Sequence, residues 1–194
     1  MSVNIAVGLG NSEARYALTR HNAGAIVLEG LAKSCGVPFM RFNKYANAYL
    51  AKGSIGSCDL TFAFAEGYMN ESGKSLAKIL KYLKADISSV AVIYDDITLE
   101  VGRMKLTVGG SSGGHNGVAD IMECCGNSFA RIRIGVGAKA DKRMDLADHV
   151  LGHFSDEDSR LVREAVDDAI GAIVMMSRGD VDQAMNNYNA KKKV

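Results

Sequence analysis

The feature that most constrains the fold is a regular alternation of short apolar runs with segments of helical periodicity. Val90–Tyr94 is a continuous apolar run that ends at two aspartates, whereas Ser72–Lys84 places leucine and isoleucine at positions i, i+3, i+4 and i+7. The first pattern is typical of a buried strand and the second of a helix with one apolar face. The alternation predicts a single-domain α/β fold, with a mixed, mostly parallel twisted sheet surrounded by helices.

Six strands and five main helices follow from these patterns. The Ala48–Ala51 and Leu60–Ala65 strands are expected to form a hairpin across Gly53–Asp59. The predicted strands are Val3–Val7, Ala48–Ala51, Leu60–Ala65, Val90–Tyr94, Arg103–Val108 and Ala130–Val136. The predicted helices are Ala23–Cys35, Ser72–Lys84, Val118–Cys124, Asp156–Arg178 and Asp180–Tyr188.

Four polar islands interrupt this apolar framework, and each contains an asparagine. Asn11 follows the first strand, Asn70 follows the Leu60–Ala65 strand, and Asp95 comes directly after Val90–Tyr94. Active sites of α/β sheets lie at the carboxyl ends of the strands, so the islands are expected to converge there. Amides and imidazoles suit a site that holds a peptide-like substrate and moves one proton. The islands are Gly8–Asn11, Thr19–Asn22, Tyr68–Gly73 and Gly113–Gly117.

The size and charge of the chain bound its class. Its 194 residues suit one domain, residues 1–194, with a flexible tail at 191–194. With 23 basic and 22 acidic residues the net charge is +1, so any nucleic-acid contact must come from a local patch. No apolar run approaches the roughly 18 residues of a membrane span, and the N-terminus does not resemble a signal peptide. We therefore expect a cytoplasmic protein.

Neither a disulfide nor a metal site is expected. The four cysteines, Cys35, Cys58, Cys124 and Cys125, form no Cys-x-x-Cys motif, which indicates free thiols in a reducing compartment. His149 and His153 have the i, i+4 spacing of zinc ligands on a helix, but Gly152 interrupts that helix and no Glu completes the motif.

Two segments match phosphate-binding motifs only in part. Gly8-x-Gly10 follows a strand, yet Glu13 occupies the third glycine position of a dinucleotide fingerprint, where a carboxylate would repel pyrophosphate. Gly73-Lys74-Ser75 resembles the end of a P-loop, but the earlier glycine falls one residue out of register. Neither motif therefore supports a nucleotide cofactor, and no cysteine lies in a recognisable nucleophile motif that would support a covalent mechanism.

Taken one at a time, the polar residues have ordinary structural interpretations. His21 suits a capping or surface position, and His115 suits a ring that supports the glycine-rich loop. Asp95 suits a turn cap, and Asp96 a solvated carboxylate. The asparagines suit turns and N-caps, and the basic residues of 103–108 and 130–136 suit a solvated sheet face.

Taken together, these residues resemble bacterial peptidyl-tRNA hydrolases over essentially the whole chain. The shared segments are Val7–Asn11, Tyr16 with Thr19–Gly24, Met69–Gly73, Asp95–Asp96, Gly113–Gly117 and Arg131–Gly135. One departure is that the family often has two lysines where this chain has Lys105 and Thr107. The resemblance implies a monomeric hydrolase that cleaves the ester between a peptide and tRNA, without a metal or other cofactor.

The resemblance also implies roles for individual residues. His21 is the expected general base, with Asp95 fixing its tautomer. Asn70 and Asn116 are expected to bind the peptide main chain, and Asn11 to sense a blocked α-amino group. Tyr16 and Tyr68 are expected to stack on the terminal nucleotide and peptide. Lys105 and Arg133 are expected to hold tRNA phosphates, with Arg131 as a weaker candidate.

Two other classes compete with this interpretation. One is a non-catalytic RNA-binding protein on the same fold, which the retention of His21, Asp95 and the asparagines argues against. The other is an amidase-like hydrolase of small N-acyl compounds, but the basic strand at 131–133 favours a polyanionic substrate.

Overall fold

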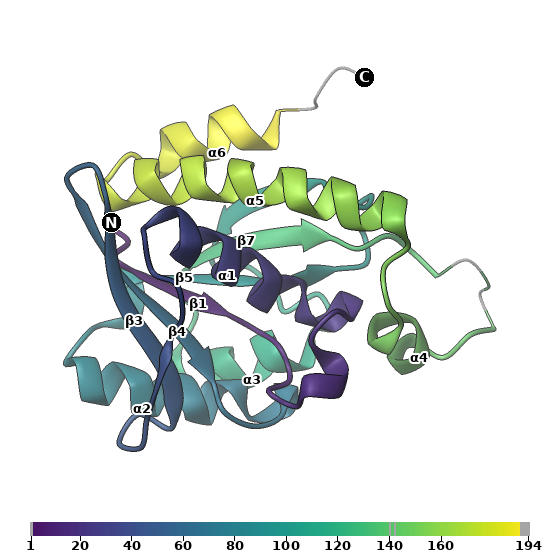
Figure 1. The fold of residues 1–194 in the computed structure, drawn as a ribbon, viewed down its shortest axis with the longest axis horizontal. Coiled ribbons are helices and arrows are strands. Elements are labelled where there is room, and N and C mark those ends of the chain that lie inside the picture. The colour runs from purple at the N-terminus through teal and green to yellow at the C-terminus, as the bar shows by residue number, and fades with distance from the viewer. Residues whose placement is uncertain (1, 140, 142, 191–194) are drawn as a thin grey trace.

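The computed structural model describes residues 2–139, 141 and 143–190, and shows one sheet between two layers of helices (Figure 1). The strands are β1 (Ile5–Gly8), β2 (Arg41–Asn43), β3 (Ala48–Ile55), β4 (Cys58–Ala65), β5 (Val90–Asp96), β6 (Met104–Val108) and β7 (Ala130–Gly135). The α-helices are α1 (Ala23–Ser34), α2 (Ser72–Leu83), α3 (Asn116–Cys125), α4 (Leu146–Leu151), α5 (Asp156–Ser177) and α6 (Val181–Asn189). Short 3-10 turns are η1 (Ala14–Tyr16), η2 (Arg20–Asn22), η3 (Met69–Glu71) and η4 (Ile87–Ser89).

The sheet is mixed, and its centre is parallel. Over the described residues the strand order is β2-β3-β4-β1-β5-β7-β6. Strands β4, β1, β5 and β7 run parallel to one another, whereas β2, β3 and β6 add antiparallel pairings at the two edges. The predicted α/β class and the hairpin of Ala48–Ala51 with Leu60–Ala65 are confirmed, although both strands extend further toward their shared turn.

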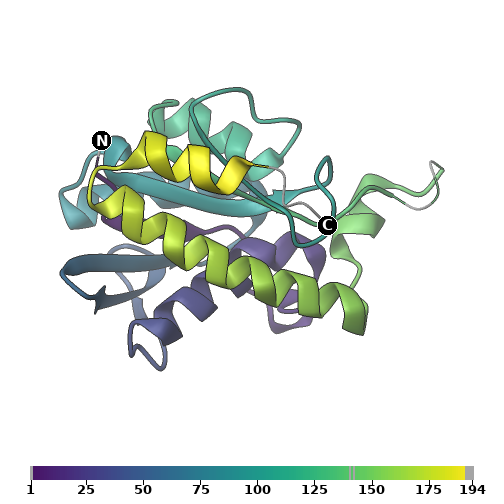
Figure 2. The ribbon, with the colours of Figure 1, turned by 90° about the horizontal axis from the view of Figure 1, so that it is seen from above.

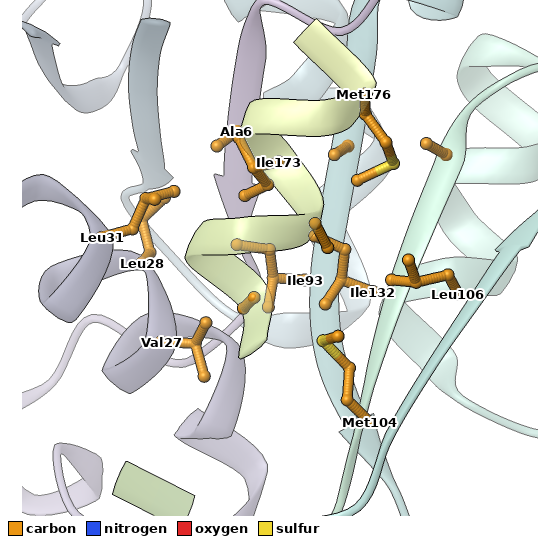
Figure 3. Packing of buried hydrophobic residues seen from close by; sticks show 14 of the residues in the cluster. Ala6, Val27, Leu28, Leu31, Ile93, Met104, Leu106, Ile132, Ile173 and Met176 are labelled. Atoms are coloured by element: carbon orange, nitrogen blue, oxygen red, sulfur yellow. The ribbon is translucent and has the colours of Figure 1, made fainter. Parts of the chain in front are cut away.

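Two apolar clusters hold the layers together. On one face, α1 and α5 pack through Leu28 and Ile173 against sheet residues such as Ile93 and Ile132 (Figure 3). On the other face, α2 and α3 pack through residues such as Ile79 and Ile121. The view from above shows α5 and α6 lying along one side of the sheet and α3 on the other (Figure 2). Because both faces are covered, β1 and the first five residues of β5 are apolar and buried, as is typical of parallel strands.

A close approach between α1 and the sheet places the second polar island. A Cβ on Gly24 would come within 2.1 Å of the Ile93 carbonyl oxygen and 2.7 Å of the Leu9 carbonyl oxygen. Only glycine therefore lets the first turn of α1 rest on the ends of β1 and β5. This contact brings η2, which directly precedes α1, alongside the end of β5.

The structure differs from the sequence prediction at the bounds of two elements that carry site residues. Strand β5 continues through Asp95 and Asp96, and both carboxylates are buried. The helix predicted from Val118 begins at Asn116, because the side chain of His115 caps it. The tail predicted at 191–194 lies outside the described residues. Among the helices that the structure describes, none has the length and apolar character that crossing a bilayer requires.

Candidate active site

A cavity of about 720 Å³ opens at the edge of the sheet where β5 and β7 end. Four groups from separate segments line it: Asn11 after β1, His21 from η2, Asp95 from β5, and His115 with Asn116 at the start of α3. The glycine-rich loop before His115 and the short helix α4 form further walls. The predicted convergence of the polar islands is therefore observed for three of the four, together with Asp95.

His21 and Asp95 form the central pair. Nδ1 of His21 lies 2.9 Å from Oδ1 of Asp95. The carboxylate is almost fully buried, while the His21 side chain keeps 15% of its surface exposed. Among the described residues none bonds to Nε2 of His21. A proton on Nδ1 satisfies the carboxylate and leaves Nε2 as the basic nitrogen, which is the arrangement that a general base needs.

His115 binds the same carboxylate oxygen from another direction. Its Nε2 lies 3.0 Å from Oδ1 of Asp95, and its Nδ1 accepts a hydrogen bond of 3.3 Å from the backbone N–H of Val118. An Nδ1 that accepts must be unprotonated, so the proton of the neutral ring is on Nε2 and is donated to Asp95. Tyr94 packs its ring edge against His115, with centroids 5.1 Å apart. His115 therefore does more than support its loop, because it also orients Asp95.

The two histidines keep Asp95 ionised. Burial by itself would raise the pKa of Asp95, but attraction to His115 and hydrogen bonds from His115 and His21 outweigh it and hold the pKa well below the ordinary carboxyl value. The site thus contains a permanent negative charge beside His21. Such a charge stabilises an imidazolium that forms when His21 takes up a proton.

The same three residues are the ones whose ligand atoms could surround a metal ion. One atom each from His21, Asp95 and His115 lies within 4.8 Å of the others. A metal on Nε2 of His115, however, would require the proton to move to Nδ1, where it would face the donor N–H of Val118. The hydrogen-bond pattern therefore suits proton transfer better than metal binding. His149 and His153, the pair with the spacing of zinc ligands, do not share one helix. Nε2 of His149 donates to the Gly137 carbonyl, and His153 lies beyond the end of α4.

Hydrogen bonds fix Asn11 so that the N–H groups of its side chain remain available as donors to a ligand in the cavity. The backbone N–H of Asn11 donates to Oδ1 of Asn22 at 2.9 Å, and Nδ2 of Asn22 donates back to the Asn11 carbonyl at 3.0 Å. Oδ1 of Asn11 accepts from the backbone N–H of Met69 at 3.1 Å. With that oxygen occupied, Asn11 offers the cavity the donor N–H groups of its side chain.

The other residues predicted to contact the substrate differ in their exposure and in whether they line the cavity. Asn116 lines the cavity as the first residue of α3. Asn70 is exposed in η3, beside the buried Met69. Tyr68 is 60% exposed, and Tyr16 is half-buried under the guanidinium of Arg15. Within the described residues, Asn70, Tyr68 and Tyr16 lie outside the cavity lining, so they suit contacts near its entrance rather than with the reacting ester.

Arg133 and Lys105 lie on one face of neighbouring strands. They are directly opposite in the antiparallel β6–β7 pair, so their side chains share a face of the sheet. Arg133 lines the cavity and forms an ion pair with Asp96. Asp96 also accepts hydrogen bonds from the backbone and hydroxyl of Thr98. The interpretation of Asp96 as a solvated carboxylate was wrong, because β5 extends far enough to bury it.

Arg131 has a structural position that the sequence pattern did not predict. It is among the largest fully buried side chains, and it donates to the Ser111 and Gly110 carbonyls and to Oδ1 of Asn127. Its guanidinium also lies over the ring of Phe129. Arg131 thus fixes the glycine-rich loop, and the expected solvated basic face is replaced by one buried and one partly exposed arginine.

Helix α4 is the part of the site that sequence analysis missed. Leu146, Val150 and Leu151 from this helix line the cavity. Asp145 caps the helix by accepting from the Ala147 N–H at 3.0 Å. An aspartate followed by apolar residues at i+1, i+5 and i+6 was the available signal, but six residues are too few for periodicity to decide. Arg20, next to His21, anchors the end of this segment by donating to the His153 carbonyl at 2.7 Å.

Comparison with known proteins gives one consistent answer. The family model described as peptidyl-tRNA hydrolase matches residues 5–194. The peptidyl-tRNA hydrolase of Agathobacter rectalis is 42% identical over 187 residues, which cover 95% of this chain and 99% of that protein. The peptidyl-tRNA hydrolase of Acinetobacter baumannii is 34% identical over 191 residues, which cover 98% of each.

Solved structures agree over the same length. A crystal structure of peptidyl-tRNA hydrolase from Acinetobacter baumannii at 1.00 Å resolution superposes with a TM-score of 0.90 at 34% identity, covering 98% of this chain and 96% of that one. A complex of peptidyl-tRNA hydrolase with N-propanol gives a TM-score of 0.91 at 33% identity, covering 99% and 97% of the two chains.

Proposed function

The chain belongs to the peptidyl-tRNA hydrolase family and hydrolyses the ester between a peptide and tRNA, and we propose that His21 is its general base. The observation that carries the proposal is the hydrogen bond between Nδ1 of His21, which lines the cavity, and buried, ionised Asp95, with no partner for His21 Nε2 among the described residues. An ester is more labile than an amide, so one oriented base and one water molecule suffice.

In the proposed reaction His21 takes up one proton from water and later gives it to the leaving ribose oxygen. Nε2 of His21 takes a proton from water as the water oxygen attacks the ester carbonyl carbon. The imidazolium that forms is stabilised by the Asp95 carboxylate. When the tetrahedral intermediate collapses, the bond to the ribose oxygen breaks and Nε2 returns the proton to that oxygen. The products are a peptide carboxylic acid, which releases its proton to solvent and becomes a carboxylate, and tRNA with a free ribose hydroxyl.

Asparagine amides supply the remaining polar groups. Asn116 lies beside His115 and is the first choice for a donor to the developing oxyanion, with Asn70 at the entrance binding the peptide main chain. Asn11 donates to the acyl oxygen on the blocked α-amino group. A free ammonium in the same place carries donors and a positive charge, so it would face another donor and be disfavoured.

tRNA phosphates are bound on the β6–β7 face in this proposal. Arg133 and Lys105 supply the positive charge, and Thr107 occupies the next position on the same face with a neutral hydroxyl. Tyr68 and Tyr16 stack on the terminal nucleotide and peptide at the cavity entrance. All proposed catalytic groups come from one chain, which supports a monomer. Free cysteines and a substrate produced by translation support the cytoplasm.

The decisive experiment compares turnover with binding. Purified protein is incubated with N-acyl-aminoacyl-tRNA and release of the acyl-amino acid is followed, while tRNA affinity is measured in parallel. Binding with no turnover would indicate the non-catalytic RNA-binding class. Turnover of small N-acyl amides with no preference for the tRNA ester would indicate the amidase class.

A further inference from the structure

Helix α2 carries a row of exposed lysines that the proposed mechanism does not use. This α2 lysine row consists of Lys74, Lys78, Lys81 and Lys84, and all four are exposed. At 3.6 residues per turn the first three lie within about 60° of one another around the helix. The opposite side of the helix, with Leu76 and Ile79, is buried against the sheet and α3. The row is therefore a continuous basic strip on the outside of the molecule, where Figure 1 shows α2.

Helix stability explains only the C-terminal part of this row, because Lys81 lies in the last turn, where the helix dipole favours a cation. Lys74 lies in the first turn, where the helix dipole disfavours a cation. Lys74 and Lys78 are four residues apart, a spacing at which like charges repel. Lys84 has φ of 52° at the C-cap, a conformation that suits glycine or asparagine.

Neighbouring acids do not neutralise the row. The segment Ser72–Lys84 contains no acidic residue, and within the described structure no ion pair joins these lysines to an acid. Asp120 on α3 accepts from the backbone N–H groups of Gly73 and Lys74. Asp86 beyond α2 accepts from the Ser88 N–H. Asp120 therefore lies beside Lys74, but Lys78 and Lys81 have no ion pair among the described residues, and in a chain with a net charge of only +1 they form a local positive field.

The row lies on the same face of the molecule as the proposed phosphate contacts of the active site. On β6 and β7, Leu106 and Ile132 point into the cluster that contains α1 and α5. Because side chains alternate along a strand, Lys105 and Arg133 must point to the other face, which is the face covered by α3 and α2. Helices α2 and α3 pack against each other.

The row also begins at the active site. Helix α2 follows η3, which carries Asn70, without a break. Gly117 at the start of α3 lies so close to Met69 that a Cβ would come within 2.7 Å of its sulfur. Lys74 is therefore the end of the row nearest Asn116, and Lys84 is the end farthest from it.

We propose that the α2 lysine row binds backbone phosphates of the tRNA body while the ester lies in the cavity. The proposal rests on the proposed function, because it assumes that the bound polyanion is the substrate. The row is about 15 Å long at 1.5 Å per residue, and a nucleic-acid strand carries one phosphate per roughly 3.4 Å of helix axis, so the row spans about four phosphates. Lysine suits this role because it acts as a point charge that reads no sequence.

The test is the double variant Lys78→Ala/Lys81→Ala, assayed with N-acyl-aminoacyl-tRNA over a range of salt concentrations. We expect KM to rise about five- to tenfold at low salt with kcat unchanged. The plot of log(kcat/KM) against log salt should flatten by about 1.5 to 2, nearly one for each lost contact. Cleavage of a short N-acyl-aminoacyl ester of a nucleoside should be unchanged. The Lys78→Arg/Lys81→Arg variant should retain the wild-type salt slope.

The charge-matched control is Arg160→Ala/Arg163→Ala, which removes two exposed cations from α5 on the opposite face. Its salt slope should stay close to that of the wild type. Equal slopes in the α2 variant and this control would overturn the proposal, and so would equal losses on the short ester and the tRNA substrate. Failure of the wild-type protein to cleave either substrate would instead overturn the proposed function.

Discussion

His21 and His115 share one carboxylate oxygen, Oδ1 of Asp95, with their ring centroids 5.1 Å apart. The two rings have different second partners. His115 is tied through Nδ1 to the first turn of α3, whereas His21 lines the cavity and its Nε2 has no partner among the described residues. In the proposed mechanism, His21 changes its protonation during the reaction and His115 orients the carboxylate.

Replacing His21 by alanine should nearly abolish ester cleavage while preserving the fold. General-base catalysis contributes roughly 10²- to 10⁴-fold, so we expect a loss of that size in single-turnover rate. tRNA affinity and the thermal midpoint should remain close to wild type. His115→Ala should lose less activity but should unfold more easily, by about 1 kcal/mol, because it removes the cap of α3. A larger rate loss in His115→Ala than in His21→Ala would reverse the two assignments.

Asp95→Asn should lower the rate and move the acid limb of the pH–rate profile to lower pH. Without the negative charge an imidazolium at His21 is less stable, so protonation of the base requires more acid. Because the pKa of Asp95 is held below its ordinary value, the carboxylate stabilises the fold above about pH 4, and this stabilisation is lost as the pH falls. The difference in unfolding free energy between wild type and variant should therefore shrink below about pH 4. An acid limb that moves upward would show that Asp95 is not the partner of His21.

Asn11→Asp should damage discrimination more than chemistry. The new side chain can still accept from the Met69 N–H, but it replaces the donor that faces the cavity by a second acceptor with negative charge. A free ammonium then becomes the better ligand, so the ratio of rates on N-blocked and unblocked aminoacyl-tRNA should fall by about 10- to 100-fold, the equivalent of one charged hydrogen bond. An unchanged ratio would give Asn11 a purely structural role.

Arg133→Ala should have two separable effects. The KM for the tRNA substrate should rise and its salt dependence should weaken by about one unit of slope. The fold should also lose about 1–3 kcal/mol, because Asp96 is buried and, within the described part of the chain, its carboxylate keeps only Thr98 as a hydrogen-bond partner. Adding Asp96→Asn should restore much of the stability without restoring KM. If the second substitution restores both, Arg133 acts through the fold and not through phosphate.

Arg131→Met should behave as a structural variant. It leaves the Gly110 and Ser111 carbonyls and the Asn127 side chain without their buried donor, which should lower the unfolding free energy by about 2–4 kcal/mol. The salt slope for tRNA should not change, since the guanidinium is buried. Chemical denaturation measures the first effect and kinetics at several salt concentrations the second. A flattened slope would show that Arg131 does contact phosphate.

Local sequence determined most of the framework. Helix α2 and strand β5 could be predicted because their apolar residues recur with the period of a helix or run without interruption. The order of strands and islands also placed Asn11 and Asp95 at one edge of the sheet, since parallel strands end together. The resemblance in the shared motifs then made His21 the expected general base among the four histidines of the chain.

Tertiary structure alone decided which polar groups pair. Nothing in the sequence near Asp95 indicates that two histidines, 74 residues before it and 20 residues after it, donate to the same oxygen. The alternation of Arg131 with Arg133 predicted one basic face of the strand, but the packing of the glycine-rich loop buries Arg131 and β5 supplies Asp96 to Arg133. The spacing of apolar residues along the sequence predicts which side chains are buried, because burial follows the local periodicity of a helix or strand. Hydrogen-bond and ion partners depend on distances between segments remote in the chain, and only the folded arrangement sets those.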